Sequence, residues 1–132
     1  MVIDTSALTA ILLQEEDART FALAIKNDPV RLVSAVSMLE TAMAVESRLG
    51  PVAGRELDLL LQKSRADVVP FDAAQAEVAR AAWQKYGKGK HPARLNFGDC
   101  CAYALAKTSG EKLLFKGEDF SKTDMVRQPE LE

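Results

Sequence analysis

Four acidic residues recur at one kind of place in this chain, where an apolar stretch ends or a helical stretch begins. In an open parallel α/β sheet these places gather in one crevice, at the carboxyl ends of the strands. Four carboxylates in one crevice would make a site for a hard divalent cation such as Mg²⁺, which prefers oxygen ligands. The residues are Asp4 after the apolar start, Glu40 and Asp99 at the openings of two helical stretches, and Asp119 after a later apolar stretch.

The elements that would position these acids alternate between strands and helices. We expect strands over residues 1–3, 30–34, 68–69 and 113–115, with a further short one over 125–127. Apolar spacing predicts helices over 5–13, 17–26, 38–49, around 57–61, from 72 to 86 and over 99–107. This alternation predicts the α/β class, with a mainly parallel sheet covered on both faces. We expect a single domain over residues 1–132, with residues 128–132 as a frayed tail.

The third helix has the clearest end, because Gly50 and Pro51 follow it and both stop helices. Its apolar residues fall at i, i+4, i+7 and i+11, which places them on one stripe. They are Met38, Ala42, Val45 and Leu49.

The composition excludes some modes of nucleic-acid binding. The chain has 132 residues, a net charge of −2, one Trp, two Tyr and five Phe. Proteins that bind nucleic acid through bulk charge have strongly basic surfaces, and those that bind through stacking are rich in aromatic residues. Any contact with a nucleic acid must therefore be local.

Cysteine usage and hydropathy bear on the compartment. Cys100 and Cys101 are adjacent on a helical stretch, where neighbouring side chains diverge, so we expect reduced, buried thiols. No apolar run approaches the roughly 18 residues that a membrane span needs. No basic region or cleavage site precedes the first strand. We therefore expect a cytoplasmic protein with no membrane partner.

Each acid also has a purely structural interpretation. Asp4 can cap the helix that follows it, and Ser37 with Glu40 matches the S-x-x-E capping box. Asp99 is favoured at a helix start by the macrodipole, and Asp119 can be a turn residue. In this alternative the chain is a catalytically silent interaction module. A metal site, in contrast, explains all four positions by one requirement.

Several stretches of the chain, in order and over nearly its whole length, resemble the PIN-domain ribonucleases and, within them, the VapC toxins of bacterial toxin–antitoxin pairs. They are V-I-D-T-S-A-L from residue 2, S-M-L-E from residue 37, L-N-F-G-D-C from residue 95, A-Y-A-L-A from residue 102, L-F-K-G-E-D-F from residue 114 and T-D at 123–124. The resemblance implies a PIN-like three-layer α/β/α sandwich and a Mg²⁺- or Mn²⁺-dependent endoribonuclease.

The family pattern also implies roles and partners. The metal ligands align with Asp4, Glu40 and Asp99, and a less uniform fourth acid aligns with Asp119. Similar enzymes hydrolyse RNA with water and leave a 5′-phosphate and a 3′-hydroxyl. A homodimer and a cognate VapB-like antitoxin, which wraps the toxin and covers its acidic site, are implied as well. Two further acids lie close to the fourth position, Glu118 and Asp124.

Three polar residues beside the acids are candidates for holding them, or a metal-bound water or phosphate, in place. They are Thr5, Ser6 and Asn96, and helix capping is the alternative for each. Ser6 also argues against a phosphotransferase with Asp4 as nucleophile, since such an enzyme would need a second Asp at that position.

A basic segment is the best candidate for gripping the RNA backbone, because Lys and Arg contacts to phosphate position a nucleic acid. The alternative is a solvated surface loop. The segment contains Lys85, Lys88, Lys90, His91 and Arg94, with Gly87 and Gly89 between them. His91 is the only histidine and has no Cys or His neighbour, so it makes a poor transition-metal ligand.

Overall fold

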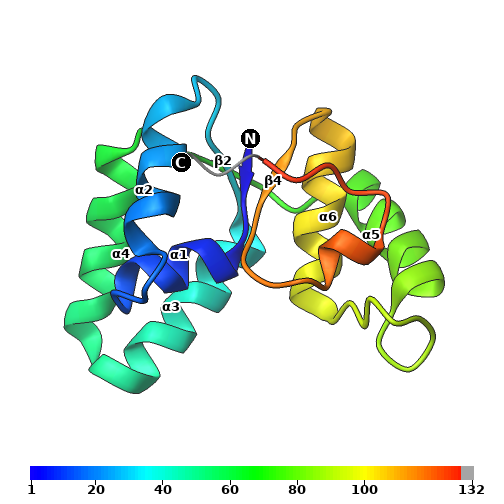
Figure 1. The fold of residues 1–132 in the computed structure, drawn as a ribbon, viewed down its shortest axis with the longest axis horizontal. Coiled ribbons are helices and arrows are strands. Elements are labelled where there is room, and N and C mark those ends of the chain that lie inside the picture. Colours follow the sequence, from blue (N-terminus) through cyan, green and yellow to red (C-terminus); the bar gives the residue numbers. More distant parts are fainter. Residues whose placement is uncertain (129–132) are drawn as a thin grey trace.

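The structure is a computed structural model that describes residues 1–128, in which a pair of helices follows each of the first three strands (Figure 1). The strands are β1 (Val2–Ile3), β2 (Leu32–Ser34), β3 (Asp67–Val69) and β4 (Leu113–Leu114). The helices are α1 (Thr5–Leu12), α2 (Ala18–Asn27), α3 (Ala35–Leu49), α4 (Pro51–Lys63), α5 (Ala73–Tyr86) and α6 (Phe97–Ser109), and a short 3-10 helix, η1 (Phe120–Lys122), follows β4.

The four strands form a parallel sheet in the order β3-β2-β1-β4. Val2 of β1 is in register with Leu32 on one side and with Leu113 on the other. Strand order therefore reverses at β1, because β2 and β3 lie on one side of it and β4 lies on the other. The carboxyl end of β1 is the switch point of the sheet, where open α/β sheets bind their ligands.

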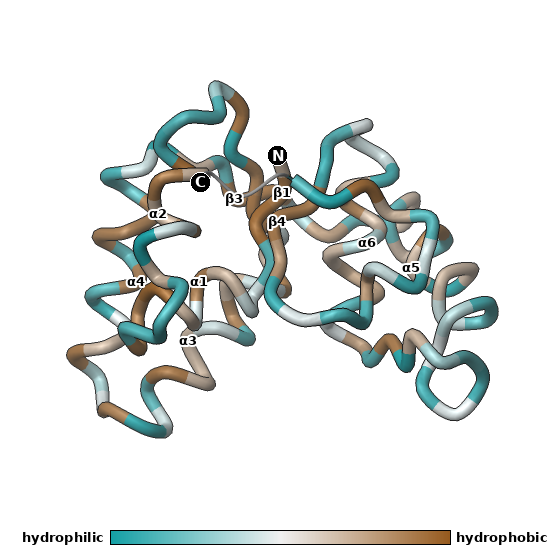
Figure 2. The backbone as a smooth tube through the Cα atoms, viewed as in Figure 1, coloured by the Kyte–Doolittle hydropathy of each residue, from teal (hydrophilic) through white to brown (hydrophobic). Residues whose placement is uncertain are grey.

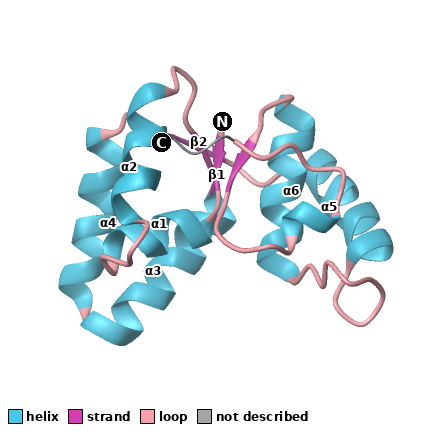
Figure 3. Cartoon of the chain, in the orientation of Figure 1, coloured by secondary structure: helices cyan, strands magenta, loops and turns pink. Residues whose placement is uncertain are grey.

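Helices cover both faces of the sheet, as Figure 3 shows. Along β1, Met1 and Ile3 face a core shared with α1, α2 and α4, whereas Val2 faces a core shared with α5 and α6. Apolar residues concentrate where β1 and β4 pass between the two groups of helices (Figure 2). This arrangement confirms the predicted three-layer α/β/α sandwich with a parallel central sheet.

The boundaries of α3 differ from the expected ones at its start. The helix begins at Ala35, because the hydroxyl of Ser34 accepts a hydrogen bond from the Val36 amide (3.2 Å) and caps it. Ser37 lies inside the helix, so the alternative in which it forms a capping box with Glu40 is wrong. The predicted stop is confirmed, since Gly50 follows with a φ of +81°. Helix α4 begins directly after it, at Pro51.

Two elements in the second half of the chain also differ from their predicted bounds. Helix α6 begins at Phe97 instead of residue 99, because Asn96 caps it. The strand expected over 125–127 reduces to a single parallel bridge between Leu113 and Arg127, and the guanidinium of Arg127 lies 4.3 Å from the ring centre of Phe115. The expected tail overlaps residues 129–132, which are outside the described part of the chain.

Both cysteines are buried and free, as expected. Burial raises the pKa of Cys100 and Cys101 to about 11, so both thiols are neutral and act as small apolar groups. None of the helices within residues 1–128 has both the length and the hydropathy to cross a lipid bilayer.

Candidate active site

Asp4 directly follows β1 and lies at the switch point of the sheet. Its amide donates to the carbonyl of Leu114 in β4 (3.0 Å), and its carboxylate accepts from the Ser6 amide (3.0 Å) and the Ser6 hydroxyl (2.5 Å). The residue is only 5% exposed. Burial raises the pKa of the Asp4 carboxyl; the hydrogen bonds from Ser6 oppose this rise, and the charge of Glu40 adds to it. Asp4 therefore caps α1, but it is buried more deeply than a cap requires.

Glu40 lies in the second turn of α3, between α1 and α6. One carboxylate oxygen accepts from the Thr5 hydroxyl of α1 (2.7 Å). The carboxylate also lies against Gly98 of α6, where a Cβ atom would overlap both oxygens. Glycine destabilises a helix by up to about 1 kcal/mol relative to alanine. The space that the missing side chain leaves for Glu40 explains why glycine nevertheless stands at position 98.

Asp99 is the third residue of α6 and forms a reciprocal capping box with Asn96. The Asp99 amide donates to the side chain of Asn96 (2.9 Å), and the Asp99 carboxylate accepts from the Asn96 amide (3.0 Å). Asn96 thus caps the helix and holds the acid in place at the same time. Burial raises the pKa of Asp99 to about 6, against the hydrogen bond from Asn96.

The four predicted acids act on one another through their charges. Asp4, Asp119 and Glu40 all contribute to the raised pKa of Asp99. Among residues 1–128, none of the four acids forms an ion pair with a basic side chain. Negative charge that is partly buried and unpaired is unfavourable. A bound cation would relieve it.

The donor set fits a hard divalent cation because all of its ligands would be carboxylate oxygens. One oxygen each of Glu40 and Asp99 makes no hydrogen bond to the described residues. No three Asp, Glu, His or Cys side chains in that part of the chain are gathered closely enough to form a metal centre. Each of the three carboxylates is instead held by a hydrogen bond of its own: Glu40 by Thr5, Asp4 by Ser6 and Asp99 by Asn96.

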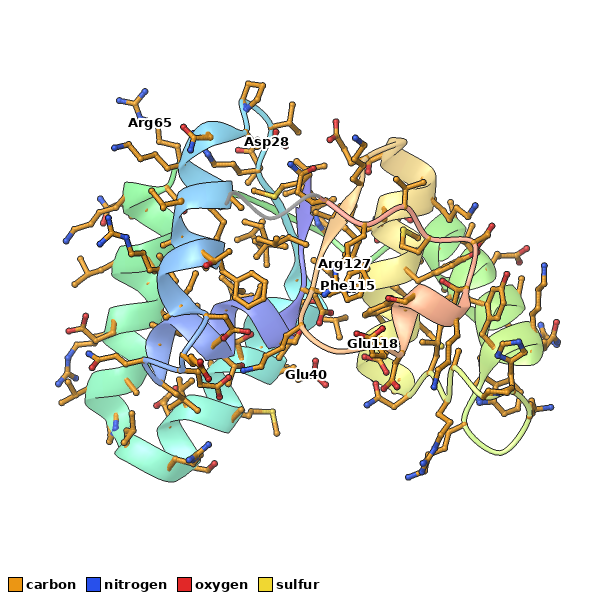
Figure 4. All side chains as sticks on the ribbon, viewed as in Figure 1. Asp28, Glu40, Arg65, Phe115, Glu118 and Arg127 are labelled. Atoms are coloured by element: carbon orange, nitrogen blue, oxygen red, sulfur yellow. The ribbon has the colours of Figure 1, made fainter. Side chains whose placement is uncertain are left out.

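The candidates for the fourth acid lie in different surroundings. Asp119 is exposed at the start of η1 and makes no capping hydrogen bond with its side chain, and its neighbour Glu118 is also exposed. Figure 4 shows Glu40 and Glu118 toward the same end of the sheet. Of Glu118 and Asp119, only Asp119 contributes to the raised pKa of Asp99.

The carboxylate of Asp124 is hydrogen-bonded to residues in the middle of α6. Its carboxylate accepts from the Tyr103 hydroxyl (2.6 Å) and from Lys107 Nζ (2.6 Å). Partial burial raises the pKa of Asp124, but the two hydrogen bonds outweigh this effect, so the pKa is lowered overall. Tyr103 and Lys107 lie about one and two turns beyond Asp99 along α6. Asp124 therefore serves the middle of α6 and not its start.

Lys116 was not among the residues predicted from the sequence. Its amide donates to the Ser6 hydroxyl (2.9 Å), and its Nζ pairs with Glu15 (2.8 Å) and Asp17 (3.1 Å). These contacts tie the loop that carries Asp119 to α1 and to the segment between α1 and α2. The partners are 110, 101 and 99 residues away in sequence, so no local pattern could have indicated them.

The predicted basic segment ends α5 and forms the loop between α5 and α6. Lys90 Nζ lies 4.3 Å from the Trp83 ring centre, and Lys85 Nζ lies 5.1 Å from the Tyr86 ring centre. None of the segment's basic side chains forms an ion pair with another described residue. A hollow of about 480 Å³ in the loop is lined by Lys88, Gly89, Lys90, His91, Pro92 and Arg94.

His91 is held by its own loop. Its Nδ1 accepts from the Ala93 amide (3.0 Å), and its ring meets the Tyr86 ring edge-on with centres 5.1 Å apart. These contacts position the imidazole as part of the loop surface. Nothing in them points to a role in proton transfer.

Comparison with known proteins agrees with this fold. The family model described as PIN domain matches residues 1–125, and the chain belongs to the PIN-domain family. Its relatives are VapC proteins. It is 56% identical over 126 residues to VapC ribonuclease Mb0640 of Mycobacterium bovis, with 96% of each chain covered. It is 57% identical to Ribonuclease VapC of Mycolicibacterium smegmatis, with 96% of this chain and 98% of that protein covered.

Solved structures show the same fold. The structure of VapC20 from Mycobacterium tuberculosis, described as a Sarcin-Ricin loop cleaving toxin, matches with a TM-score of 0.79 and 20% identity, covering 97% of this chain and 98% of that one. A toxin–antitoxin complex from Klebsiella pneumoniae matches with a TM-score of 0.71 and 18% identity, covering 95% and 93%. The predicted family and its α/β/α fold are therefore confirmed.

Proposed function

We propose that this chain is a divalent-metal-dependent endoribonuclease and the toxin of a toxin–antitoxin pair. Cleavage of RNA is supported by its close relatives, which are named ribonucleases. The observation that carries the metal requirement is the set of acids around Asp99, whose charges raise its pKa and have no basic partner among residues 1–128. We propose Mg²⁺ as the ion, with Mn²⁺ as the alternative.

The acids have separate tasks in this proposal. Asp4, Glu40 and Asp99 hold the ion, directly or through its waters. Asp119 adds a ligand or orients the attacking water, a role we assign to it instead of Asp124 because Asp124 is bonded to Tyr103. When bound, the ion supplies a water of lowered pKa and offsets charge on the phosphoryl oxygens. The products would carry a 5′-phosphate and a 3′-hydroxyl.

The supporting residues keep the carboxylates in position. Ser6 holds Asp4 and receives the amide of Lys116, and Thr5 holds Glu40. Since catalysis by positioning depends on small displacements, these hydroxyl groups would matter although they need not touch the substrate.

Partners follow from the same proposal. The basic segment from Lys85 to Arg94 would contact RNA phosphates. A cognate VapB-like antitoxin would cover the acidic site, and a toxin–antitoxin complex among the structural neighbours supports such a pairing. A homodimer is supported by apolar side chains beside Glu40, since Leu39 is 59% and Met43 is 65% exposed. We propose that the protein acts in the cytoplasm.

One observation favours the alternative of a silent interaction module. The capping box between Asn96 and Asp99 is fully formed, so the acid has a structural task without any metal. The two functions differ in what Asp99→Asn does, because asparagine can still accept the hydrogen bond from the Asn96 amide but loses the charge.

The decisive experiment measures RNA cleavage with Mg²⁺, with Mn²⁺ and with a chelator, and maps the ends of the products. We expect Asp99→Asn to reduce the rate by roughly 100-fold or more, since it removes an anionic ligand. Asp124→Asn is the matched control and should stay within about threefold, because its carboxylate faces Tyr103 and Lys107. Cleavage that persists in chelator, or survives Asp99→Asn, would support the alternative.

A further inference from the structure

All the aromatic side chains that are not buried line one cavity. The chain has one Trp, two Tyr and five Phe. Five of these residues belong to the cores and are at most 6% exposed: Phe21, Tyr86, Tyr103, Phe115 and Phe120. The remaining three, Phe71, Trp83 and Phe97, surround a cavity of about 400 Å³ between α5 and α6.

Exposed aromatic side chains and short apolar side chains line the cavity together. Phe97 is 74% exposed and Trp83 is 45% exposed, and we call these two the aromatic rim; the alanine and cysteine side chains of the lining are short. Arg80 is the charged residue in the lining. The volume of the cavity lies within the range of about 300–1,000 Å³ typical of small-ligand sites. A planar group of the size of a nucleobase can therefore enter.

The start of α6 connects the cavity with the candidate active site. Phe97 is the first residue of α6, Gly98 next to it contacts the Glu40 carboxylate, and Asp99 follows. Phe97 and Cys100 line the cavity, whereas none of the four acids does. Since residues two apart on a helix do not face each other, Phe97 and Asp99 lie on different sides of the same helical turn.

The charges around the rim suit an anionic ligand. Arg80 lines the cavity, and Lys90 lies over the Trp83 ring without an ion-pair partner among the described residues. The whole chain is acidic, with a net charge of −2, so cations beside the exposed aromatic rings are a local feature. An apolar peptide would have no need of them, whereas a base needs aromatic stacking and its phosphate needs cations.

We propose that this cavity binds an unpaired nucleobase of the RNA, next to the phosphodiester bond at the acids. This inference rests on the proposed nuclease function and assigns a binding position to one base of its substrate. A base inside a duplex is stacked and paired and cannot enter a side cavity, whereas unpaired bases can be splayed out and stacked on aromatic side chains. Stacking between Trp83 and Phe97, with Arg80 and Lys90 near the backbone, would select such a base.

Trp83 is the only tryptophan, so its fluorescence reports on the cavity directly. The probes are a single-stranded hexanucleotide RNA, the same backbone with abasic sites, and the hexanucleotide paired in a duplex. They are titrated into the Asp99→Asn protein to keep the RNA intact. We expect the single strand to quench Trp83 and to bind about 5- to 150-fold more tightly than the abasic strand, the range of one stacked base.

Phe97→Ala, in the same background, should remove most of that difference while leaving the affinity for the abasic strand unchanged. Leu59→Ala is the control, since Leu59 is 44% exposed on α4 and lies outside this cavity. Equal affinity for the base-containing and abasic strands would overturn the proposal. So would equal quenching by the duplex, or a change of oligomeric state in Phe97→Ala that accounts for the weaker binding and makes this surface a protein interface.

Cleavage by the wild-type protein is read separately. Metal-dependent cleavage without base-dependent binding would overturn the cavity proposal alone. Base-dependent quenching without metal-dependent cleavage would overturn the nuclease and leave the cavity as an RNA-binding site.

Discussion

The carboxylate of Glu40 in α3 lies against the α-carbon of Gly98 in α6, so close that a methyl group would overlap both of its oxygens. The contact brings an acid from the middle of the chain to the helix that carries Asp99. The same carboxylate also accepts a hydrogen bond from the Thr5 hydroxyl (2.7 Å). The first turn of α6 therefore sets where this carboxylate lies.

We predict that Gly98→Ala lowers RNA cleavage by about tenfold or more, because small displacements of positioned groups have large effects on rate. The measurement is kcat on a defined RNA, with a melting curve to show that the protein remains folded.

Gly54→Ala is the matched control for this change. A Cβ at Gly54 in α4 would also meet a carboxylate, that of Glu46, but Glu46 is exposed and can swing away. Alanine is the better helix former by up to about 1 kcal/mol, so this variant should keep full activity and lose no stability. Equal losses in both variants would contradict a special role for the Glu40 contact.

The raised pKa of Asp99 predicts how stability varies with pH in the absence of metal. The folded protein binds the Asp99 proton with a pKa of about 6 and the unfolded chain with the ordinary value of 3.8. The free energy of unfolding should therefore increase as the pH falls from above 6 toward 4, and buried Asp4 acts in the same direction.

Urea unfolding in chelator at pH 7.5 and pH 5.0 measures this effect. We expect a gain of roughly 1–2 kcal/mol at pH 5.0, after allowance for solvent screening of a partly exposed group. Asp99→Asn should be more stable than wild type at pH 7.5 and should show less of the gain. A wild-type protein that loses stability between these two pH values would contradict the prediction.

Metal binding should stabilise the fold, since a cation bound only by the native state shifts unfolding by mass action. At pH 7.5 we expect saturating Mg²⁺ or Mn²⁺ to raise Tm by about 5 °C or more. Asp4→Asn should abolish most of the shift, and Asp124→Asn should leave it intact. A melting curve that does not move with millimolar metal would count against the proposed site.

Lys116 should affect activity more than stability. Its ion pairs with Glu15 and Asp17 are exposed to solvent, which screens them, so they contribute little to stability. They hold the loop that carries Asp119, so we predict that Lys116→Met lowers kcat by roughly three- to tenfold with little change in Tm. Lys122→Met, at the end of η1, is the control and should match wild type in both measurements.

The basic loop should contribute to RNA affinity by neutralising phosphates of the backbone. For Lys88→Ala combined with Lys90→Ala, the slope of log K against log salt concentration should become less steep by roughly 0.7 for each phosphate that is no longer neutralised. The pair Lys63→Ala and Lys112→Ala removes the same charge from exposed positions elsewhere and should leave the slope unchanged. An unaltered slope in the first pair would leave the loop as solvated surface.

Features with local causes could be predicted from the sequence. Apolar strands followed by polar residues indicated the parallel sheet, which the structure has. Because such a sheet gathers its strand ends at one edge, the same pattern led to the prediction that Asp4, Glu40, Asp99 and Asp119 meet there, and this remains a prediction. Helix starts were less certain. Ser34 and Ser37 are both good caps, and the structure uses Ser34 since strand β2 ends there.

Contacts between distant segments were beyond the reach of sequence patterns. Thr5 bonded to Glu40, and Lys116 bonded to Glu15, depend on how helices and loops are packed and not on spacing. Gly98 could have been noticed in the sequence, because glycine is unfavourable inside a helix and often marks a place where another group approaches closely. The aromatic cavity carried no such signal. A composition poor in aromatic residues argued against extensive stacking, yet folding brings Trp83 and Phe97 together at one place.

The order of the strands has a consequence for synthesis of the protein. Asp4 is synthesised first and follows β1. The neighbour of β1 on one side is β4, which lies near the end of the chain, and Asp99 and Asp119 are also synthesised late. A nascent or truncated chain that ends before residue 99 lacks Asp99 and Asp119, which are two of the four acids. The four acids can therefore come together only when synthesis of the chain is nearly complete.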